Sequence, residues 1–214
     1  MTPRESKTAL MKVDFSSIPS WSQEEVTEGF HLVRDHKFLP CSNVVGNKRA
    51  IPWLYPENGC FLRAALSRRL LSLKGYPGIK KLFVFGDFKY KSKWAETGYV
   101  AFKFHVAVAT RVEREIYILD PSVDYEKPLL LLHWSQRLTS ESQNKTIEYS
   151  LCSDLTVSHN SECNEMEESN EVGIRRGMPH TMEFFAMEYL AKEYENIHQL
   201  GLDPKRELSI GSDN

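Results

Sequence analysis

Two β-rich runs separated by only a few residues constrain the fold of this chain more than any other feature. Val100 to Thr110 and Glu115 to Asp120 are rich in β-branched and aromatic residues, and apolar and polar side chains alternate along them. The intervening residues 111–114 have the length of a β-hairpin loop. Pro121 ends the second run, because proline has no N–H to donate to a neighbouring strand. The sequence therefore predicts an antiparallel pair, with Lys81 to Phe85 as another strand.

The segment from Asn58 to Lys74 has the clearest helical pattern. Leucines four residues apart form an apolar stripe, and charged or small polar residues occupy the opposite side. The stripe consists of Leu62, Leu66 and Leu70. Gly75 follows where helices often stop. We expect Asn58 to be the N-cap, because its side chain can accept a backbone hydrogen bond there, so that Gly59 and Cys60 are the first two helical residues.

Two further helices are predicted on either side of this central region. Ser22 to Val33 begins with Ser22 and carries Glu25 three residues later, which is the spacing of a capping box. Thr181 to His198 has a second apolar stripe, formed by Phe184, Met187, Ala191 and Tyr194 with Leu190 beside them. Grouped strands flanked by helices favour an α+β fold, in which an antiparallel sheet packs against the helix that begins near Cys60.

The length of 214 residues suits a single domain. Residues 1–20 are polar and are expected to form an N-terminal arm or a short docking segment. Residues 21–214 are predicted to be one catalytic domain, for the reasons given below, with its core at residues 52–137. Residues 140–177 are rich in Ser, Asn and Glu and indicate a polar insertion without regular structure, followed by the C-terminal helix at about 181–198.

Composition and charge exclude several classes of protein. A net charge of −2 provides no overall positive field, so we expect no nucleic-acid partner. The longest apolar run is far shorter than the roughly 20 residues of a membrane-spanning helix, so no membrane span is expected. Residues 1–12 lack the apolar stretch of a Sec signal peptide. These features favour a cytoplasmic protein, or one delivered into a host cell by a specialised secretion system.

The spacing of the cysteines does not match that of a disulfide-rich protein. Their positions, Cys41, Cys60, Cys152 and Cys163, are irregularly spaced. A chain of this length does not need a disulfide framework, so we expect reduced thiols. Cys152, His159 and Cys163 lie close together, but their spacing fits no zinc pattern and a fourth ligand is missing, so we expect no metal site.

Cys60 is placed where a thiol becomes reactive. At a helix start, free backbone N–H groups and the positive end of the helix dipole both favour the thiolate. Gly59 leaves room for a substrate to approach, and the local N–H groups, that of Cys60 included, can hold a developing oxyanion. The alternative for a single cysteine is a small apolar residue buried at a helix start.

His105 and Asp120 are expected to face each other across the predicted hairpin. If residues 111–114 form the loop, Thr110 pairs with Glu115, and counting outward pairs His105 with Asp120 on the same face. The carboxylate would then accept the Nδ1–H and leave Nε2 for a thiol. A register slip of one residue would place the carboxylate on the opposite face.

Together, Cys60, His105 and Asp120 form the set of nucleophile, base and orienting group that covalent acyl transfer requires. Asn58 and Gly59 adjoin the nucleophile and are candidates for substrate binding. Trp53, Tyr55 and Trp134 are candidate walls of the cleft, although aromatic residues near a helix start are also ordinary core residues.

Several short segments recur in the order Cys, His, Asp. They are Asn58 to Ala64 around the cysteine, a Gly75-Tyr76 turn that leads to Lys80 to Gly86, Phe104 to Ala107 around the histidine, Ile118 to Ser122 with its Asp-Pro-Ser ending, and Trp134. In this order and with these separations they resemble the protein-glutamine deamidases, also called protein glutaminases. The resemblance covers about Pro52 to Arg137.

The resemblance implies a papain- and transglutaminase-like core and a protein substrate with an accessible glutamine. Cys60 would attack the glutamine carboxamide, ammonia would leave with a proton from His105, and water would hydrolyse the thioester to glutamate. No metal or organic cofactor is required. The alternatives are a cysteine peptidase or transglutaminase with the same triad, and a binding module without activity. The resemblance and the lack of a Sec signal suggest a bacterial effector that alters a host protein; the oligomeric state stays open.

Overall fold

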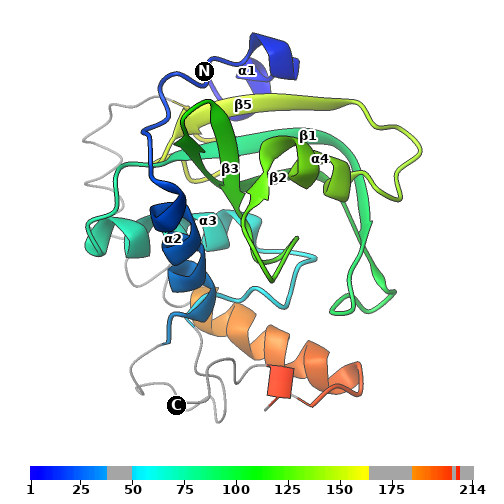
Figure 1. Cartoon of the computed structure of the whole chain (residues 1–214). Helices are drawn as coiled ribbons and strands as arrows, with labels where there is room; N and C mark the ends of the chain where they lie inside the picture. The colour runs from blue at the N-terminus through cyan, green and yellow to red at the C-terminus, as the bar shows by residue number, and fades with distance from the viewer. Residues whose placement is uncertain (38–49, 164–184, 204–205, 208–214) are drawn as a thin grey trace.

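A five-stranded antiparallel sheet in the order β4-β3-β2-β1-β5 forms the centre of the molecule (Figure 1). The computed structural model describes residues 1–37, 50–163, 185–203 and 206–207. The strands are β1 (Lys80–Lys91), β2 (Tyr99–Val112), β3 (Glu115–Leu119), β4 (Leu129–Leu130) and β5 (Ile147–Ser153). Helix α3 (Cys60–Leu73) packs against β2. The predicted α+β fold, with an antiparallel sheet against the cysteine-bearing helix, is confirmed.

The β2–β3 hairpin is tighter than the sequence predicted. Val112 pairs with Glu115, so the turn contains only Glu113 and Arg114. Glu113 has a φ of 52°, in the left-handed region that a non-glycine residue rarely adopts, and the sequence therefore carried no signal for this turn. The register is shifted by two residues from the prediction, and a shift of two keeps every side chain on its expected face.

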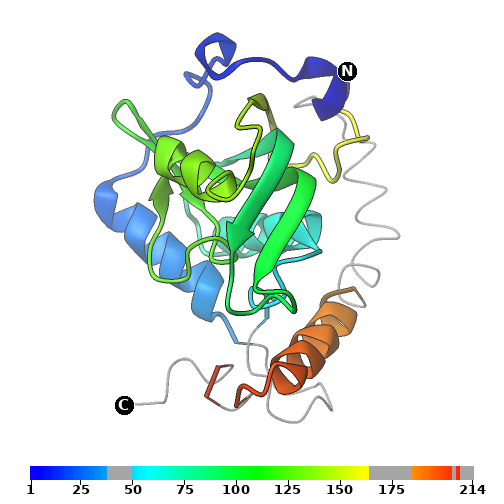
Figure 2. The same cartoon turned by 90° about the vertical axis from the view of Figure 1, so that its right-hand side faces the viewer.

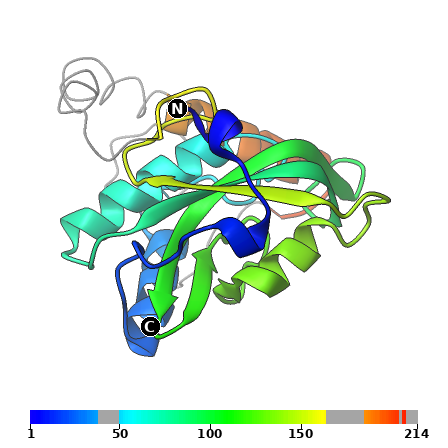
Figure 3. The ribbon, with the colours of Figure 1, turned by 90° about the horizontal axis from the view of Figure 1, so that it is seen from above.

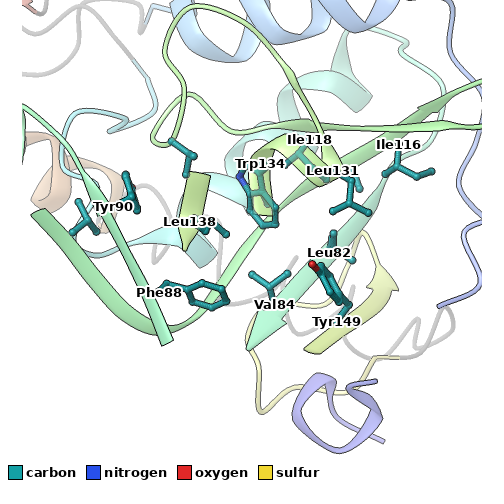
Figure 4. Close-up of a cluster of buried hydrophobic side chains, with 14 of the residues drawn as sticks. Leu82, Val84, Phe88, Tyr90, Ile116, Ile118, Leu131, Trp134, Leu138 and Tyr149 are labelled. Atoms are coloured by element: carbon teal, nitrogen blue, oxygen red, sulfur yellow. The ribbon is translucent and has the colours of Figure 1, made fainter. Parts of the chain in front are cut away.

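The two faces of the sheet carry separate apolar clusters. One cluster contains β-strand residues together with α4 (Leu131–Leu138), and Trp134 lies at its centre (Figure 4). The other face packs against α3 and α2 (Gln23–Asp35), which lie side by side below the sheet in Figure 1. Helix α2 begins with the predicted capping box, since Ser22 and Glu25 each accept the other's backbone N–H.

Strand β5 corrects the prediction of an irregular insertion at residues 140–177. It pairs with β1 from Lys80 to Gly86 and completes one side of the sheet. Its sequence alternates apolar and polar residues, with Ile147, Tyr149 and Leu151 at the apolar cluster, and the polar residues around it masked this short pattern. Residues 164–177 of the predicted insertion lie outside the described residues.

The N-terminal arm is docked. It contains α1 (Pro3–Ser6) and a 3₁₀ turn (Leu10–Lys12), and seen from above it crosses β5 (Figure 3). Thr8 and Tyr149 exchange two backbone hydrogen bonds of 2.9 and 2.7 Å. Ile18 is buried in the cluster of Trp134. The first part of the arm therefore lies along the outer edge of β5, and its last residues reach β2, where Ser20 bridges to Arg111.

Cys152 and Cys163 form a disulfide, which corrects the expectation of reduced thiols. The bond links the end of β5 to the segment that follows it in the chain. It closes a loop, because the two cysteines are 11 residues apart in the sequence. His159, within this loop, packs its ring 4.0 Å from that of Phe104. Neither sulfur is therefore free to bind a metal, and the histidine serves packing.

Cys163→Ser is expected to lower the free energy of unfolding by about 3 kcal/mol, because the closed loop no longer restricts the unfolded chain. Urea unfolding followed by circular dichroism measures the change. A reducing agent should destabilise the unaltered protein by a similar amount and leave the serine variant unchanged. Equal stability of the two proteins under oxidising conditions would contradict the expectation.

A helix at residues 185–199 lies beneath the sheet, beside the segment that leads into α3 (Figure 2). Its buried face is formed by Ala186, Leu190, Glu193 and Ile197. The predicted stripe was wrong in part, since Met187 and Tyr194 are 43% and 36% exposed; Phe184, like residues 181–183, lies outside the described residues. None of the helices in the described ranges has the length and apolar character to cross a membrane.

Candidate active site

The nucleophile candidate begins a helix. Cys60 is the first residue of α3, and Gly59 is its N-cap with a φ of 78°. The prediction that Asn58 caps the helix was wrong, because its Oδ1 accepts the N–H of Gly59 at 2.7 Å and the backbone turns there. Arg63 donates the first helical bond to the carbonyl of Gly59, at 3.0 Å. The N–H of Cys60 therefore precedes the first helical hydrogen bond and points toward the helix start.

Cys60 and His105 come from opposite sides of the sheet and meet at its open edge. His105 shares a face with Val84, its neighbour on β1, whereas Cys60 packs in a cluster on the other face. β3 pairs with β2 only as far as Val108, opposite Leu119, so within the described strands residues 105–107 have no neighbour on that side. The His105 ring and the backbone N–H of Val106 both act on the sulfur at this edge and lower the pKa of the thiol.

Asp120 lies just past the end of β3 and accepts three side-chain hydrogen bonds. Its Oδ2 is 2.7 Å from His105 Nε2 and accepts the indole N–H of Trp134 at 3.0 Å. Its Oδ1 accepts the hydroxyl of Ser122 at 2.6 Å. The predicted nitrogen was wrong, because Nε2 faces the carboxylate and leaves Nδ1 as the second ring nitrogen. In the observed register Asp120 follows the partner of Val108, so it is not directly opposite His105 as predicted.

Burial and charge act against each other at these groups. Burial by itself raises the pKa of the Cys60 thiol, but the hydrogen bond and charge of His105, the charge of Arg63 and the N–H of Val106 together lower it. Burial by itself lowers the pKa of His105, but the charge of Asp120 and the hydrogen bonds to Asp120 and Cys60 raise it to about 9. At neutral pH these directions favour a thiolate beside an imidazolium.

The carboxyl group remains ionised. Burial raises the pKa of Asp120, but the charge and hydrogen bond of His105, the charge of Arg63 and the hydroxyl of Ser122 lower it below its ordinary value. Phe102 stacks on the His105 ring with centroids 4.9 Å apart, and both His105 and Asp120 are almost fully buried. The ring is thus held on its edge by a carboxylate and on its face by an aromatic side chain.

The arrangement can perform nucleophilic acyl transfer. A thiol of lowered pKa contacts a base, and a carboxylate orients that base, which is the geometry that covalent catalysis by cysteine uses. The described residues contain no group of three or more His, Cys, Asp or Glu side chains that could hold a metal ion.

Two of the residues predicted to line the substrate cleft, Trp53 and Trp134, are buried in the core. Trp53 is 2% exposed and donates its indole N–H to the Val33 carbonyl at 2.9 Å, so it belongs to the core between α2 and α3. Trp134 is fully buried and reaches Asp120, not a surface. The expectation that these rings line the cleft is therefore replaced by a core role and an orienting role.

Tyr55 and Asn58 lie nearer the surface beside the start of α3. Asn58 is exposed and Tyr55 half-buried. The Tyr55 ring lies 6.1 Å from that of Tyr189, which comes from the helix at residues 185–199. A Cβ on Gly59 would stand 3.1 Å from the Tyr189 ring, so only glycine fits comfortably here. Phe185, one turn earlier, packs against Phe61 at 6.5 Å.

Sequence reasoning missed Ser122, Arg63 and Tyr189 as parts of this region. Ser122 belongs to the Asp-Pro-Ser ending, where a hydroxyl two residues after a carboxylate commonly bonds back to it. Arg63 carried a signal as a charged residue close to a nucleophile at a helix start. Tyr189 carried none, because only the tertiary fold brings the C-terminal helix to Gly59.

The sequence profile of the glutaminase family matches residues 26–138, more than half of the chain. A search of curated proteins found no match. Among solved structures, the chain is similar to protein-glutaminase from Chryseobacterium proteolyticum, with 22% identity over 71% of this chain and 78% of that one and a TM-score of 0.53. A crystal structure of protein-glutaminase matches at 22% identity over 70% and 81%, with a TM-score of 0.52. On the profile match, this chain belongs to the glutaminase family.

Proposed function

We propose that this protein hydrolyses the side-chain amide of glutamine residues in protein substrates, through a thioester on Cys60. The observation that carries the proposal is the buried His105, which bonds to the Asp120 carboxylate at 2.7 Å and lowers the pKa of the Cys60 thiol at the start of α3. Membership of the glutaminase family supports the reaction class, and the similar solved structures of protein-glutaminases support a protein as the substrate.

The reaction proceeds in two halves. The thiolate of Cys60 attacks the carboxamide carbon, and the oxygen becomes an oxyanion close to the backbone N–H of Cys60 at the start of α3. The tetrahedral intermediate expels the amine with a proton from His105, which forms ammonia and a thioester. Water then attacks the thioester, gives one proton to His105 and releases glutamate, and the thiolate–imidazolium pair is restored.

In this proposal the half-buried rings of Tyr55 and Tyr189 contact the glutamine side chain of the substrate as it enters the site. The Tyr189 ring lies against Gly59, where it would stand 3.1 Å from a Cβ, and the Tyr55 ring lies 6.1 Å from that of Tyr189. A glutamine side chain is long and narrow, so aromatic walls suit its methylene groups while the amide reaches the sulfur. In this proposal Asn58 and Gly59 contact the substrate beside them.

Intact-mass spectrometry of a glutamine-containing protein tests the function. Incubation with this chain should raise the substrate mass by about one unit per site, release ammonia and leave the backbone uncut. Cleavage of the backbone would replace the proposal with a cysteine peptidase, and incorporation of an added amine would replace it with a transglutaminase. If the mass of every protein tested stayed the same, a binding module without activity would be favoured. Delivery into a host cell stays a prediction.

The pH dependence of kcat/KM is expected to be bell-shaped. Activity falls on the acid side as the Cys60 thiolate is protonated, and this limb lies below the ordinary range of a thiol because the pKa is lowered. Activity falls on the alkaline side at pH about 9, where His105 loses the proton that the leaving ammonia needs. Initial rates of ammonia release between pH 4 and 11 measure both limbs, which belong to the coupled pair. A rate that keeps rising beyond pH 10 would contradict this assignment.

A further inference from the structure

Arg63 is a buried arginine one turn after the nucleophile. It is 2% exposed and lies on α3 three residues beyond Cys60. Its Nη1 donates to three backbone carbonyls of the segment that leads into the helix: Tyr55 at 3.0 Å, Pro52 at 3.5 Å, and Asn58. One guanidinium nitrogen therefore ties together the turn that delivers Gly59 and Cys60.

The rest of the guanidinium is poorly compensated. Within the described ranges, its Nε and Nη2 have no hydrogen-bond partner, although both are buried. The guanidinium lies over the Trp53 ring at 6.0 Å, the outer limit of a cation–π contact, which gives Nε and Nη2 no hydrogen-bond acceptor. A permanent charge in such a place costs stability, and an apolar side chain of similar length would avoid that cost. Stability alone therefore does not explain an arginine at this position.

The charge acts on the reacting groups. It lowers the pKa of the Cys60 thiol and of the Asp120 carboxyl, in each case after the larger effect of His105. The ionisable groups that face this region include His105 on β2, Asp120 after β3, Tyr90 on β1, Glu57 before α3 and Tyr189 on the C-terminal helix. Glu193 on the same helix is also buried there and accepts the Leu54 N–H at 2.5 Å. Arg63 is the permanent cation within this set.

We propose that Arg63 is a positioning residue of the proposed deamidation: its guanidinium holds the 52–59 segment so that the Cys60 sulfur stays at the open edge of β2, and it supplies a fixed positive charge beside that sulfur. The two roles are separable. The three carbonyl bonds need a donor at the position of Nη1, which lies one bond further along the side chain than a lysine Nζ, whereas a lysine still supplies a positive charge. The inference rests on the proposed function for its kinetic consequences and on the geometry alone for its effect on the thiol.

The test compares Arg63→Met, Arg63→Lys and, as the matched control, Arg68→Met. Arg68 lies on the same helix but is half-buried and pairs with Asp154 at 2.7 Å instead of with the 52–59 segment. The rate of Cys60 alkylation by iodoacetamide is followed against pH by mass spectrometry of the peptide that contains Cys60. This readout does not require glutaminase activity, so it stands even if the proposed function fails.

Arg63→Met is expected to raise the pH midpoint of alkylation by about one unit, and to lower kcat about 10–100-fold with a smaller change in KM. Arg63→Lys is expected to keep the midpoint near that of the unaltered protein while kcat falls about 10-fold, because the carbonyl bonds are lost. Arg68→Met should leave both unchanged.

Two results would overturn the inference. One is an Arg63→Met protein that folds, by circular dichroism, with an unchanged alkylation midpoint, since a purely structural arginine would lower only the melting temperature. The other is an Arg63→Lys protein with an unchanged kcat, and this arm decides the question if the methionine variant does not fold.

Discussion

Replacing Cys60 by alanine is expected to lower kcat/KM for glutamine deamidation by at least about 10⁴-fold. The variant has no atom that can form the thioester, and the N–H groups at the start of α3 then act only on the uncatalysed attack of water. Ammonia release from a glutamine-containing protein measures the loss. Circular dichroism should remain that of the unaltered protein, because the side chain is small and only half-buried.

Cys60→Ser separates the thiolate from the shape of the side chain. A serine hydroxyl fits the same position, but its pKa is far too high for the neighbouring imidazolium to hold it ionised, so a loss of a similar order is expected. Activity above about one hundredth of the unaltered rate in the alanine variant would exclude the thioester route. The same result would leave the family membership in place and move the chemistry to another residue.

The faces and order of the central elements could be predicted because they depend on local patterns. Alternation along β2 separates His105 from Val106, and the hairpin brings the Asp120 end of β3 to the same sheet region. Side chains along a strand alternate between its two faces, so the two-residue error in the turn leaves each side chain on its predicted face. The helix from Cys60 was likewise visible from its leucine spacing.

The atomic details could not be predicted because they depend on rare backbone conformations. Glu113 and Gly59 both adopt a positive φ, and each moves a boundary by one or two residues. The first shortens the hairpin and shifts the register of β3 along β2. The second makes Cys60 the first helical residue. Composition carries no information on either dihedral angle except that glycine permits one of them.

Burial of the tryptophans also escaped prediction, since a large aromatic ring suits a cleft and a core equally. Trp134 lies in the core but uses its one polar atom on the Asp120 carboxylate. Trp53 uses its N–H on the Val33 carbonyl. Sequence alone does not distinguish these cases, because the partner of an indole N–H is set by tertiary contacts. The same limit applies to Tyr189, which approaches Gly59 from a helix far along the chain.

The site therefore depends on a sheet whose neighbouring strand ends early. If β3 continued beyond Leu119, its backbone would occupy the edge of β2 where the sulfur meets the His105 ring. Pro121 ends the strand and Asp120 turns back toward the ring. The same local break thus opens the edge to the thiol and supplies the orienting carboxylate.

Asp120→Asn tests whether that carboxylate acts through its charge. An asparagine oxygen at the Oδ2 position can still accept from His105 Nε2 and from the Trp134 indole. The amide nitrogen at the Oδ1 position can donate to the Ser122 hydroxyl, but the backbone N–H of Ser122 loses its 3.3 Å acceptor. The ring orientation is therefore kept, but the negative charge is lost. Burial then lowers the pKa of His105 from about 9, so less imidazolium is present at neutral pH.

For this variant we expect a fall in kcat/KM of about 10²–10⁴-fold at pH 7.5 and an alkaline limb that moves to lower pH. Asp120→Ala should lose more, because the ring also loses its hydrogen bond. Asp124→Asn is the matched control, since Asp124 follows four residues later and bonds to Arg137 and to nearby backbone N–H groups instead of the histidine. Its pH profile should match that of the unaltered protein. An alkaline limb that stays at pH about 9 in Asp120→Asn would mean that the carboxylate orients the imidazole without holding its proton.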